Sequence, residues 1–347
     1  IGEGTATGAP AAVSEFTATS PVDGTCEATL SFKLPVADIA GNALEGEKAL
    51  TSVEILRDGK VIATITDGLD ATAPVVYTDR DESLTLGIHK YSVVAVNGAG
   101  RGPAAEAEVL IGARKPVAPA SALMIEEGNT GKVTISWEPV TTDVEGNTFK
   151  PEAVTYRVVN RNYETVADNV TGTSVTIQAV EEGEQAFVQF GVYAVTAGGE
   201  SEKLTGTAYK PVGKPYETPW TESFANRSIS SIFGFNYIVG SEPWQFVSTS
   251  DWGITPQDED GGFAYFEAYG SYTALVTGKI SLEGIYNPAF TYYTYNYEMS
   301  SGEPTNAIEV QADEGDGRGF VKVQSDVVVE TGELNQWNKV VVSLAAY

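Results

Sequence analysis

The sequence predicts an all-β protein made of successive β-sandwich domains, and three observations support this fold class. Thr, Val, Ser, Gly and Tyr are plentiful, whereas Ala, Leu, Glu and Lys runs with a helical period are scarce. Segments that alternate between apolar and polar residues recur between Gly- and Asp-rich turns, which is the pattern of half-buried strands. One such segment also repeats later in the chain, at a spacing that suits a small sandwich domain.

The repeat consists of two strands joined by a glycine-rich turn. Residues 91–112 read YSVVAVNGAGRGPAAEAEVLIG, and residues 190–213 read FGVYAVTAGGESEKLTGTAYKPVG. Alternate residues of the first strand share one face in each copy: Tyr91, Val93 and Ala95, then Phe190, Val192 and Ala194. Each copy ends in an apolar residue followed by Gly, which we interpret as a joint between domains.

These joints divide the chain into four parts. Residues 9–112 and 113–213 are two sandwich domains, and residues 214–347 form a third domain. Residues 1–8 are either the tail of a preceding domain or a disordered linker, since Ile1 and Gly2 resemble the joints at Ile111 and Val212.

Composition restricts the function. Asp and Glu outnumber Lys and Arg by 47 to 21, which gives a net charge of −26. This balance argues against nucleic acid or an anionic membrane as a partner, because both require basic residues, and it is compatible with Ca²⁺ binding. No apolar run is long enough to span a membrane, and a secretion leader is expected to be removed or to lie upstream. Cys26 is the only cysteine, so no disulfide forms within the chain.

The first two domains share further elements. The alternation of Cys26, Ala28, Leu30 and Phe32 predicts a strand with one buried face. Asp58 and Gly59 form a two-residue hairpin signal between two further strands. The second domain repeats this plan: Val133, Ile135 and Trp137 match Ala28, Leu30 and Phe32, and Gly146-Asn147 matches Gly41-Asn42.

The first two domains resemble the fibronectin type III family. The resemblance lies in Trp137 on a second strand, Tyr91 on a penultimate strand and Asn97 just after that strand. The resemblance implies that the Tyr91 hydroxyl ties its strand to the chain upstream, as in a tyrosine corner. Two departures are Phe190 in place of that Tyr, which removes the tie from the second domain, and Phe32 in place of a Trp. No Arg-Gly-Asp occupies either turn, so integrin-type recognition is not supported. The family implies spacers or interaction modules.

The third domain is rich in aromatic residues and in short strands separated by Gly/Asp turns. Glu222 to Phe224, Leu275–Leu282 and Trp337–Tyr347 resemble the cleaved-adhesin and MAM-like jelly rolls of bacterial surface proteins, which are common in Bacteroidetes. In that family further strands follow the last segment, so we expect the natural protein to continue past Tyr347. The alternative is a smaller sandwich that closes without those strands.

Catalytic residues are not evident, and the chain is predicted not to be an enzyme. We assign His89 to the strand face opposite Tyr91 and so expect it to face solvent. Cys26 is expected to be a buried thiol, which behaves as a small hydrophobic side chain. Neither pattern supports a nucleophile with a base, and no paired-carboxylate motif typical of glycosidases appears.

A Ca²⁺ site is the best metal candidate. Asp258, Glu259 and Asp260 precede two glycines, and Ca²⁺ prefers several oxygen ligands in a tightly folded loop. Glu222 lies where the resembled adhesin family often has a metal ligand. Asp313 and Asp316 form a second acidic turn. Both loops are alternatively interpreted as solvated hairpin tips.

Exposed aromatic residues suggest a ligand-binding surface. Tyr293, Tyr295 and Tyr297 share one face of a predicted strand, and Trp252 lies in a polar loop. Aromatic rings of this kind pack against sugar rings, although they also fill sandwich cores.

The leading hypothesis is a non-catalytic adhesion protein, secreted or on the outer-membrane exterior of a Gram-negative bacterium, that binds an extracellular glycan or protein. The alternatives are a structural subunit of a cell-surface assembly, which contacts other chains, and an accessory region of a larger secreted hydrolase.

Overall fold

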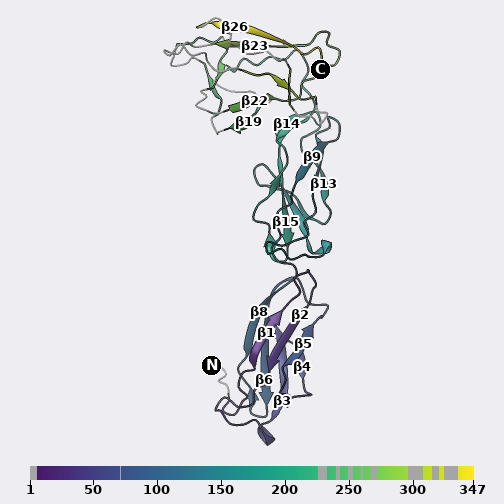
Figure 1. Ribbon diagram of the computed structural model, residues 1–347, viewed down its shortest axis with the longest axis vertical. Coiled ribbons are helices and arrows are strands. Elements are labelled where there is room, and N and C mark those ends of the chain that lie inside the picture. The colour runs from purple at the N-terminus through teal and green to yellow at the C-terminus, as the bar shows by residue number, and fades with distance from the viewer. Residues whose placement is uncertain are drawn as a thin grey trace. The chain divides into compact units, whose positions relative to one another are not determined.

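The computed structural model describes ten stretches of the chain. They are residues 6–70, 72–225, 233–239, 243–248, 253–258, 261–266, 272–295, 308–314, 320–323 and 335–347. Apart from two short 3-10 helices, η1 (Gly46–Lys48) and η2 (Pro151–Ala153), the regular elements of these stretches are strands. The prediction of an all-β fold is therefore confirmed (Figure 1).

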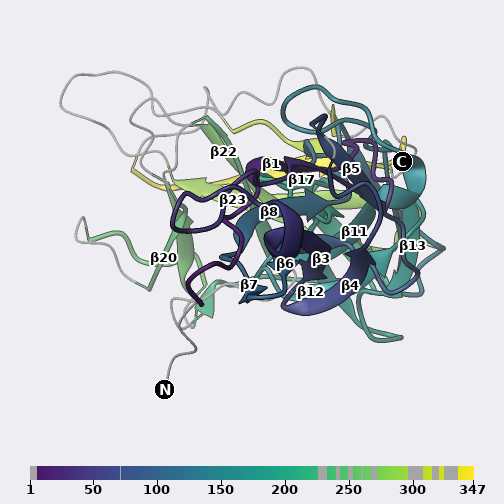
Figure 2. The ribbon, with the colours of Figure 1, turned by 90° about the horizontal axis from the view of Figure 1, so that it is seen from below.

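The first sandwich contains two sheets. One has the order β1-β2-β5, and the other has the order β4-β3-β6-β7, with β8 also paired to β6. The strands are β1 (Ser14–Thr19), β2 (Ala28–Lys33), β3 (Leu50–Arg57), β4 (Lys60–Ile65), β5 (Val75–Asp79), β6 (Gly87–Asn97), β7 (Gly100–Arg101) and β8 (Ala105–Ile111). Figure 2 shows β4, β3, β6 and β7 side by side. A three-stranded sheet and a five-stranded sheet thus form the sandwich, a two-sheet fold that agrees with the one the sequence resemblance implied.

The turns of the first sandwich follow from local sequence. Asp58 and Gly59 connect β3 to β4 with φ values of 51° and 79°. Positive φ at both central residues is what a two-residue hairpin of type I′ requires, and Gly adopts it without steric cost. The predicted hairpin is confirmed, as is the tight turn between Asn97 and Gly100, which pair across β6 and β7.

The core of the first sandwich lies between its two sheets. The largest contributions come from side chains that alternate along β2, β3 and β6 and are fully buried: Leu30, Phe32, Val53, Ile55, Tyr91 and Val93. Residues two apart on a strand point to the same face, so the period-two pattern of the sequence identified this set.

The second sandwich has the sheets β13-β10-β9 and β12-β11-β15-β16, with β17 also paired to β15, and a ladder of β14 with β18. The strands are β9 (Ala122–Glu126), β10 (Lys132–Trp137), β11 (Thr155–Asn160), β12 (Thr165–Val170), β13 (Ser174–Gln178), β14 (Gln185–Val188), β15 (Phe190–Thr196), β16 (Gly199–Glu200), β17 (Thr205–Gly206) and β18 (Lys210–Gly213). Phe190, Val192 and Ala194 are buried, as predicted.

Both sandwiches contain the same Asp-x-x-Gly-Asn loop. Asp38 Oδ1 accepts hydrogen bonds from the backbone amides of Ala40 and Asn42, each at 2.9 Å. Asp143 Oδ1 repeats the pattern with the amides of Glu145 (2.9 Å) and Asn147 (2.8 Å). A buried carboxylate that satisfies several loop amides explains why the Gly-Asn pairs recur at matching positions.

The described part of residues 214–347 consists of two-stranded ladders. They are β19 (Phe233–Val239) with β22 (Tyr272–Thr277), β20 (Gln245–Val247) with β21 (Phe263–Tyr265), β23 (Ala289–Tyr295) with β26 (Trp337–Ser343), and β24 (Gln311–Ala312) with β25 (Val321–Lys322). Trp337 forms edge-to-face contacts with Phe263 and Tyr295. The aromatic richness of this region therefore serves, in part, a packed interior.

Chain contacts divide the described structure into two compact units. One comprises residues 1–125, 134–177 and 189–208, and the other comprises residues 126–133, 178–188 and 209–347. The second unit thus joins two segments of the second sandwich to the C-terminal region. The domain limits predicted from sequence, at residues 112 and 213, stay predictions.

Candidate functional site

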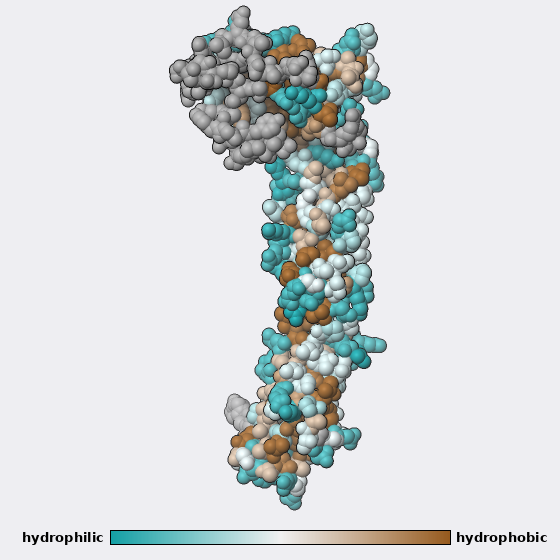
Figure 3. All heavy atoms as spheres, viewed as in Figure 1, coloured by the Kyte–Doolittle hydropathy of each residue, from teal (hydrophilic) through white to brown (hydrophobic). Residues whose placement is uncertain are grey.

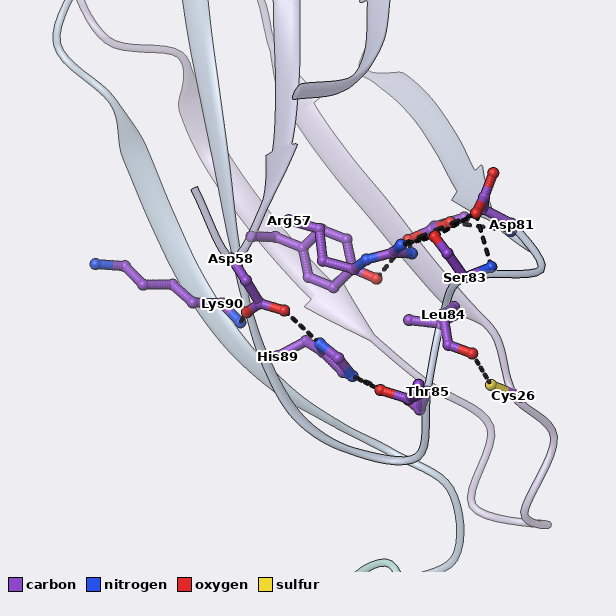
Figure 4. Close-up of polar contacts among 11 residues, drawn as sticks. Cys26, Arg57, Asp58, Asp81, Ser83, Leu84, Thr85, His89 and Lys90 are labelled. Atoms are coloured by element: carbon purple, nitrogen blue, oxygen red, sulfur yellow. Dashed lines mark hydrogen bonds and ion pairs between the residues drawn. The ribbon is translucent and has the colours of Figure 1, made fainter. Parts of the chain in front are cut away.

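Polar side chains gather at one end of the first sandwich, where β3 and β5 end and β6 begins (Figure 4). We call this group the polar cluster. Its members are Arg57, Asp58, Asp79, Asp81, Ser83, Thr85, His89 and Tyr91. Antiparallel pairing of β3 with β6 sets Arg57 opposite Tyr91, and Asp79 ends β5 in the facing sheet. The two sheets therefore bring side chains distant in sequence into contact.

A buried ion pair forms the centre of the polar cluster. Arg57 Nη1 lies 2.7 Å from Asp79 Oδ2, and the Tyr91 hydroxyl donates to the same oxygen at 2.7 Å. Asp79 and Tyr91 are fully buried, and Arg57 is 8% exposed. A buried charge is tolerated only when it is paired and hydrogen-bonded, and this carboxylate meets both conditions.

The Tyr91 hydroxyl performs the upstream tie that the sequence predicted. Its acceptor is the side chain of Asp79, twelve residues earlier in the chain. Burial raises the pKa of Tyr91 well above its ordinary value, and the hydrogen bond to Asp79 raises it further. The phenol therefore stays neutral and remains a hydrogen-bond donor at physiological pH.

The loop between β5 and β6 is held by the same network. Arg57 Nη2 donates to the Ser83 hydroxyl at 2.5 Å, and the Ser83 amide donates to Asp81 Oδ1 at 2.8 Å. Hydrogen bonds from the side chain and then the amide of Ser83 hold the pKa of Asp81 below its ordinary value. The polar cluster thus shapes this loop as well as the sandwich interior.

The expectation that His89 faces solvent is wrong. His89 is buried, and its ring contacts the β3–β4 turn and the β5–β6 loop. The physical reason is parity: residues 89 and 91 are two apart on β6, so both side chains point inward. Nδ1 lies 2.7 Å from Asp58 Oδ2, and Nε2 lies 2.9 Å from the carbonyl oxygen of Thr85.

The surroundings of His89 resemble a nucleophile–histidine–carboxylate relay, because the Thr85 hydroxyl lies 3.2 Å from Nε2. The hydrogen bonds favour a different role. Nδ1 lies beside the Asp58 carboxylate, and Nε2 lies beside both the carbonyl oxygen and the hydroxyl of Thr85. Which ring nitrogen donates depends on the tautomer. His89 is best understood as a brace between Asp58 and the β5–β6 loop.

Asp58 completes this brace. Its Oδ1 accepts the backbone amide of Lys90 at 3.0 Å. The bond with His89, followed by the bond from the Lys90 amide, holds the pKa of Asp58 below its ordinary value. The hairpin turn, the start of β6 and the β5–β6 loop are therefore joined through two side chains.

The expectation that Cys26 is buried is also wrong. Cys26 is exposed, and its Sγ lies 3.4 Å from the carbonyl oxygen of Leu84. Strand β2 begins only at Ala28, so the alternation that buries Ala28 and Leu30 does not extend back to residue 26. Among the described contacts, the thiol has a carbonyl neighbour and no base.

Two of the predicted metal-site segments lie next to each other. The Gly262 amide donates to the Ser223 carbonyl oxygen at 2.7 Å, and the Gly261 amide donates to the Asp258 carbonyl oxygen at 3.0 Å. Glu222 Oε1 accepts the Phe224 amide at 2.7 Å. Within the described stretches, no three acidic, His or Cys side chains form a metal-binding group. Glu259, Asp260 and Asp316 lie outside these stretches, and Asp313 is described.

The predicted aromatic ligand-binding surface also lies only partly within the described residues. Tyr293 on β23 is 40% exposed, whereas Tyr295 packs edge-to-face on Trp337 at 5.4 Å between ring centroids. Trp252 and Tyr297 lie outside the described residues. Elsewhere, hydrophobic and hydrophilic residues are interspersed over the visible surface of the two sandwiches (Figure 3).

Comparison with solved structures finds tandem fibronectin type III proteins. A two-domain fibronectin type III segment of chicken tenascin is 15% identical, with 59% of this chain and 99% of that chain covered and a TM-score of 0.28. The FN1–FN3 domains of chicken CNTN1 are 14% identical over 59% of this chain and 68% of that chain, with a TM-score of 0.25. The spore cortex lytic enzyme SleM of Clostridium perfringens is 15% identical over 29% of this chain and 28% of that chain, with a TM-score of 0.21.

No family model matches the sequence, and no curated protein matches it. Within the described residues, no helix is long and apolar enough to cross a membrane.

Proposed function

We propose that this chain is a non-catalytic, extracellular adhesion-type protein in which the two sandwiches act as spacers. The main support for the proposal is that the polar side chains of the polar cluster are engaged in hydrogen bonds and an ion pair with one another. The Asp79 carboxylate accepts from Arg57 and Tyr91, and both ring nitrogens of His89 lie within hydrogen-bond distance of Asp58 or Thr85. Polar groups engaged in this way stabilise a fold.

We further propose that ligand binding belongs to the C-terminal region, residues 214–347, as a jelly roll of the cleaved-adhesin type. The partner is a glycan or a protein surface met outside the cell. Support comes from Tyr293, which is exposed on β23, opposite Lys339 of β26 in the strand register. An exposed phenol ring beside a flexible ammonium group suits the apolar face and the hydroxyl groups of a sugar.

The test is binding of the full chain to an immobilised glycan array, with Tyr293→Ala as the variant. We expect at least a tenfold loss of affinity for any glycan bound by the natural protein, which corresponds to about 1.4 kcal/mol. Tyr163→Ala is the matched control, because Tyr163 is more exposed than Tyr293 and belongs to the second sandwich. Equal losses in both variants, or none in either, would contradict the proposed location.

Ca²⁺ binding between the Glu222 and Asp258 segments is a second proposal for the same region. It is supported by the hydrogen bond from Gly262 to Ser223, which brings the two segments together, and by the acidic sequence of residues 258–260. A ligand that binds only the folded state raises its melting temperature. Melting in millimolar Ca²⁺ and in EDTA tests the proposal, and identical melting temperatures would refute it.

A further inference from the structure

One glutamine side chain lies between two backbone segments of the compact unit that contains the C-terminal region. Gln185 begins β14, and its Oε1 accepts the backbone amide of Lys279 at 2.5 Å. Its Nε2 donates to the carbonyl oxygens of Lys214 (2.9 Å) and Lys279 (3.0 Å). Gln185 thereby satisfies both backbone groups of Lys279, a residue ninety-four positions later in the chain.

The side chain of Lys279 makes the reciprocal contact. Its Nζ lies 2.8 Å from Glu126 Oε2 and 2.9 Å from Asn129 Oδ1. The second oxygen of the same carboxylate, Glu126 Oε1, accepts the Gly213 amide at 2.8 Å. The Lys279 and Glu126 side chains are only 25% and 12% exposed, so water screens this ion pair less than it screens an exposed one.

Backbone hydrogen bonds around Lys279 join the same segments. The Tyr216 amide donates to the Lys279 carbonyl oxygen at 2.9 Å, and the Ser281 amide donates to the Tyr216 carbonyl oxygen at 2.8 Å. Gly278 fits tightly beneath Gln185, since a Cβ at this position would collide with Gln185 Oε1. Its φ is not in the left-handed region, so the small size of glycine, and not its backbone freedom, is what the contact requires.

We propose that Gln185, Glu126 and Lys279 form a latch that fixes the C-terminal region to residues 126–133 and 178–188 of the same compact unit. The three residues come from segments 178–188, 126–133 and 209–347, which belong to one compact unit. Gln185 provides geometric precision through three backbone bonds, and Lys279 adds a charge-assisted bond. The latch is a conformational device within this unit, and it holds whether or not the proposed ligand is a glycan.

Gly278→Ala in the full chain tests the latch. The added methyl group must displace Gln185, so we expect the Lys279 amide to exchange its hydrogen faster by on the order of tenfold, which corresponds to about 1.4 kcal/mol. Amides of the β23–β26 ladder should be unaffected. Gly172→Ala is the matched control, because Gly172 also lacks a positive φ and a methyl group there would meet no atom within 4 Å. Unchanged exchange at Lys279 in the Gly278 variant would overturn the proposal.

Lys279→Gln keeps the test decisive if Gly278→Ala accelerates exchange throughout the C-terminal region. This variant removes the ammonium group and leaves the backbone bonds of Gln185 possible. We expect faster exchange at the Gly213 amide, whose acceptor Glu126 loses its partner. Lys132→Gln is the control, since Lys132 and Glu127 form a more exposed pair at 3.4 Å in the same segment. Equal responses of the two variants would refute the role of Lys279.

Discussion

The first and second sandwiches share a strand order but differ in the side chains at one pair of facing strand positions. In the first, Arg57 pairs with Tyr91 across β3 and β6, and both side chains bond to Asp79. In the second, the corresponding register pair is Asn160 with Phe190. One fold position therefore accepts either a buried ion pair with a phenol or an apolar ring.

The second sandwich still has a tyrosine tie, but from another strand. Tyr156 of β11 is buried, and its hydroxyl accepts the Val140 amide at 2.9 Å. Tyr156 also packs on Trp137, with 5.1 Å between ring centroids. Phe190 does remove the tie expected at its own position. The hydroxyl contact can therefore move between strands while the sandwich topology stays the same.

The two solutions differ in their sensitivity to mutation. A buried ion pair contributes little net stability compared with a well-packed apolar pair, but loss of one partner leaves an uncompensated buried charge. An apolar ring carries no such risk. We therefore expect the first sandwich to have the larger single-residue effects.

Asp79→Ala should have the largest effect. Arg57 would remain buried without its counter-charge, and the free energy of unfolding of the first sandwich should fall by about 3–5 kcal/mol. Denaturant titration of the full chain, followed by amide exchange in β6, measures this loss. Asp70→Ala, at an exposed loop position, should change the same free energy by less than about 0.5 kcal/mol. Similar losses of unfolding free energy in Asp79→Ala and Asp70→Ala would show that the buried ion pair has no special importance for stability.

Tyr91→Phe and Tyr156→Phe compare the two hydroxyl ties directly. Tyr91 donates to a charged group, and loss of such a bond costs about 1.5–3 kcal/mol. Tyr156 accepts from a neutral amide, and loss of that bond costs about 0.5–1.5 kcal/mol. Amide exchange in β6 and in β11 reports the two sandwiches separately. A larger loss for Tyr156→Phe would reverse the expected order.

The two sandwiches should differ least in the stability that comes from the Asp-x-x-Gly-Asn loop they share. Bonds from the side chain and then the amide of Asn42 lower the pKa of Asp38. Burial opposes the shift at Asp143, but bonds from Asn147 outweigh it and lower that pKa also. A lowered pKa in the folded state adds stability above about pH 4. That stability disappears as the pH falls through the folded-state pKa.

Asp38→Asn and Asp143→Asn should therefore destabilise their sandwiches at pH 7 and less at about pH 2.5, which lies below the ordinary pKa of Asp, because the charge-dependent stability is lost as the pH falls. Unfolding at the two pH values, again resolved by amide exchange, measures the change. Asp67→Asn, in an exposed loop of the first sandwich, is the control. A deficit that is the same at both pH values would show that these carboxylates stabilise their loops independently of charge.

Much of the sandwich architecture could be predicted from local sequence. Asp58 and Gly59 specified a hairpin, and period-two alternation specified the buried face of β6, because both signals are short in range. The error at Cys26 arose from extending an alternation beyond the start of a strand. The error at His89 arose from assigning opposite parity to residues two apart.

The polar cluster could not be predicted because its members meet only after folding. Asp79 lies twenty-two residues from Arg57 and in the facing sheet. One signal was present: Arg57 continues the inward face of Val53 and Ile55 on β3, and a charge in that position needs a partner. Sequence periodicity identifies such a need without identifying the residue that meets it.

We infer that the polar cluster is a structural element of a spacer. A double-mutant cycle on Arg57→Met and Asp79→Leu, with unfolding of the first sandwich as the readout, tests it most directly. We expect each single variant to be destabilised by about 3 kcal/mol or more, and the double variant to recover most of that loss. Single-variant losses that simply add in the double variant would contradict the claim, because the two charges would then not stabilise each other.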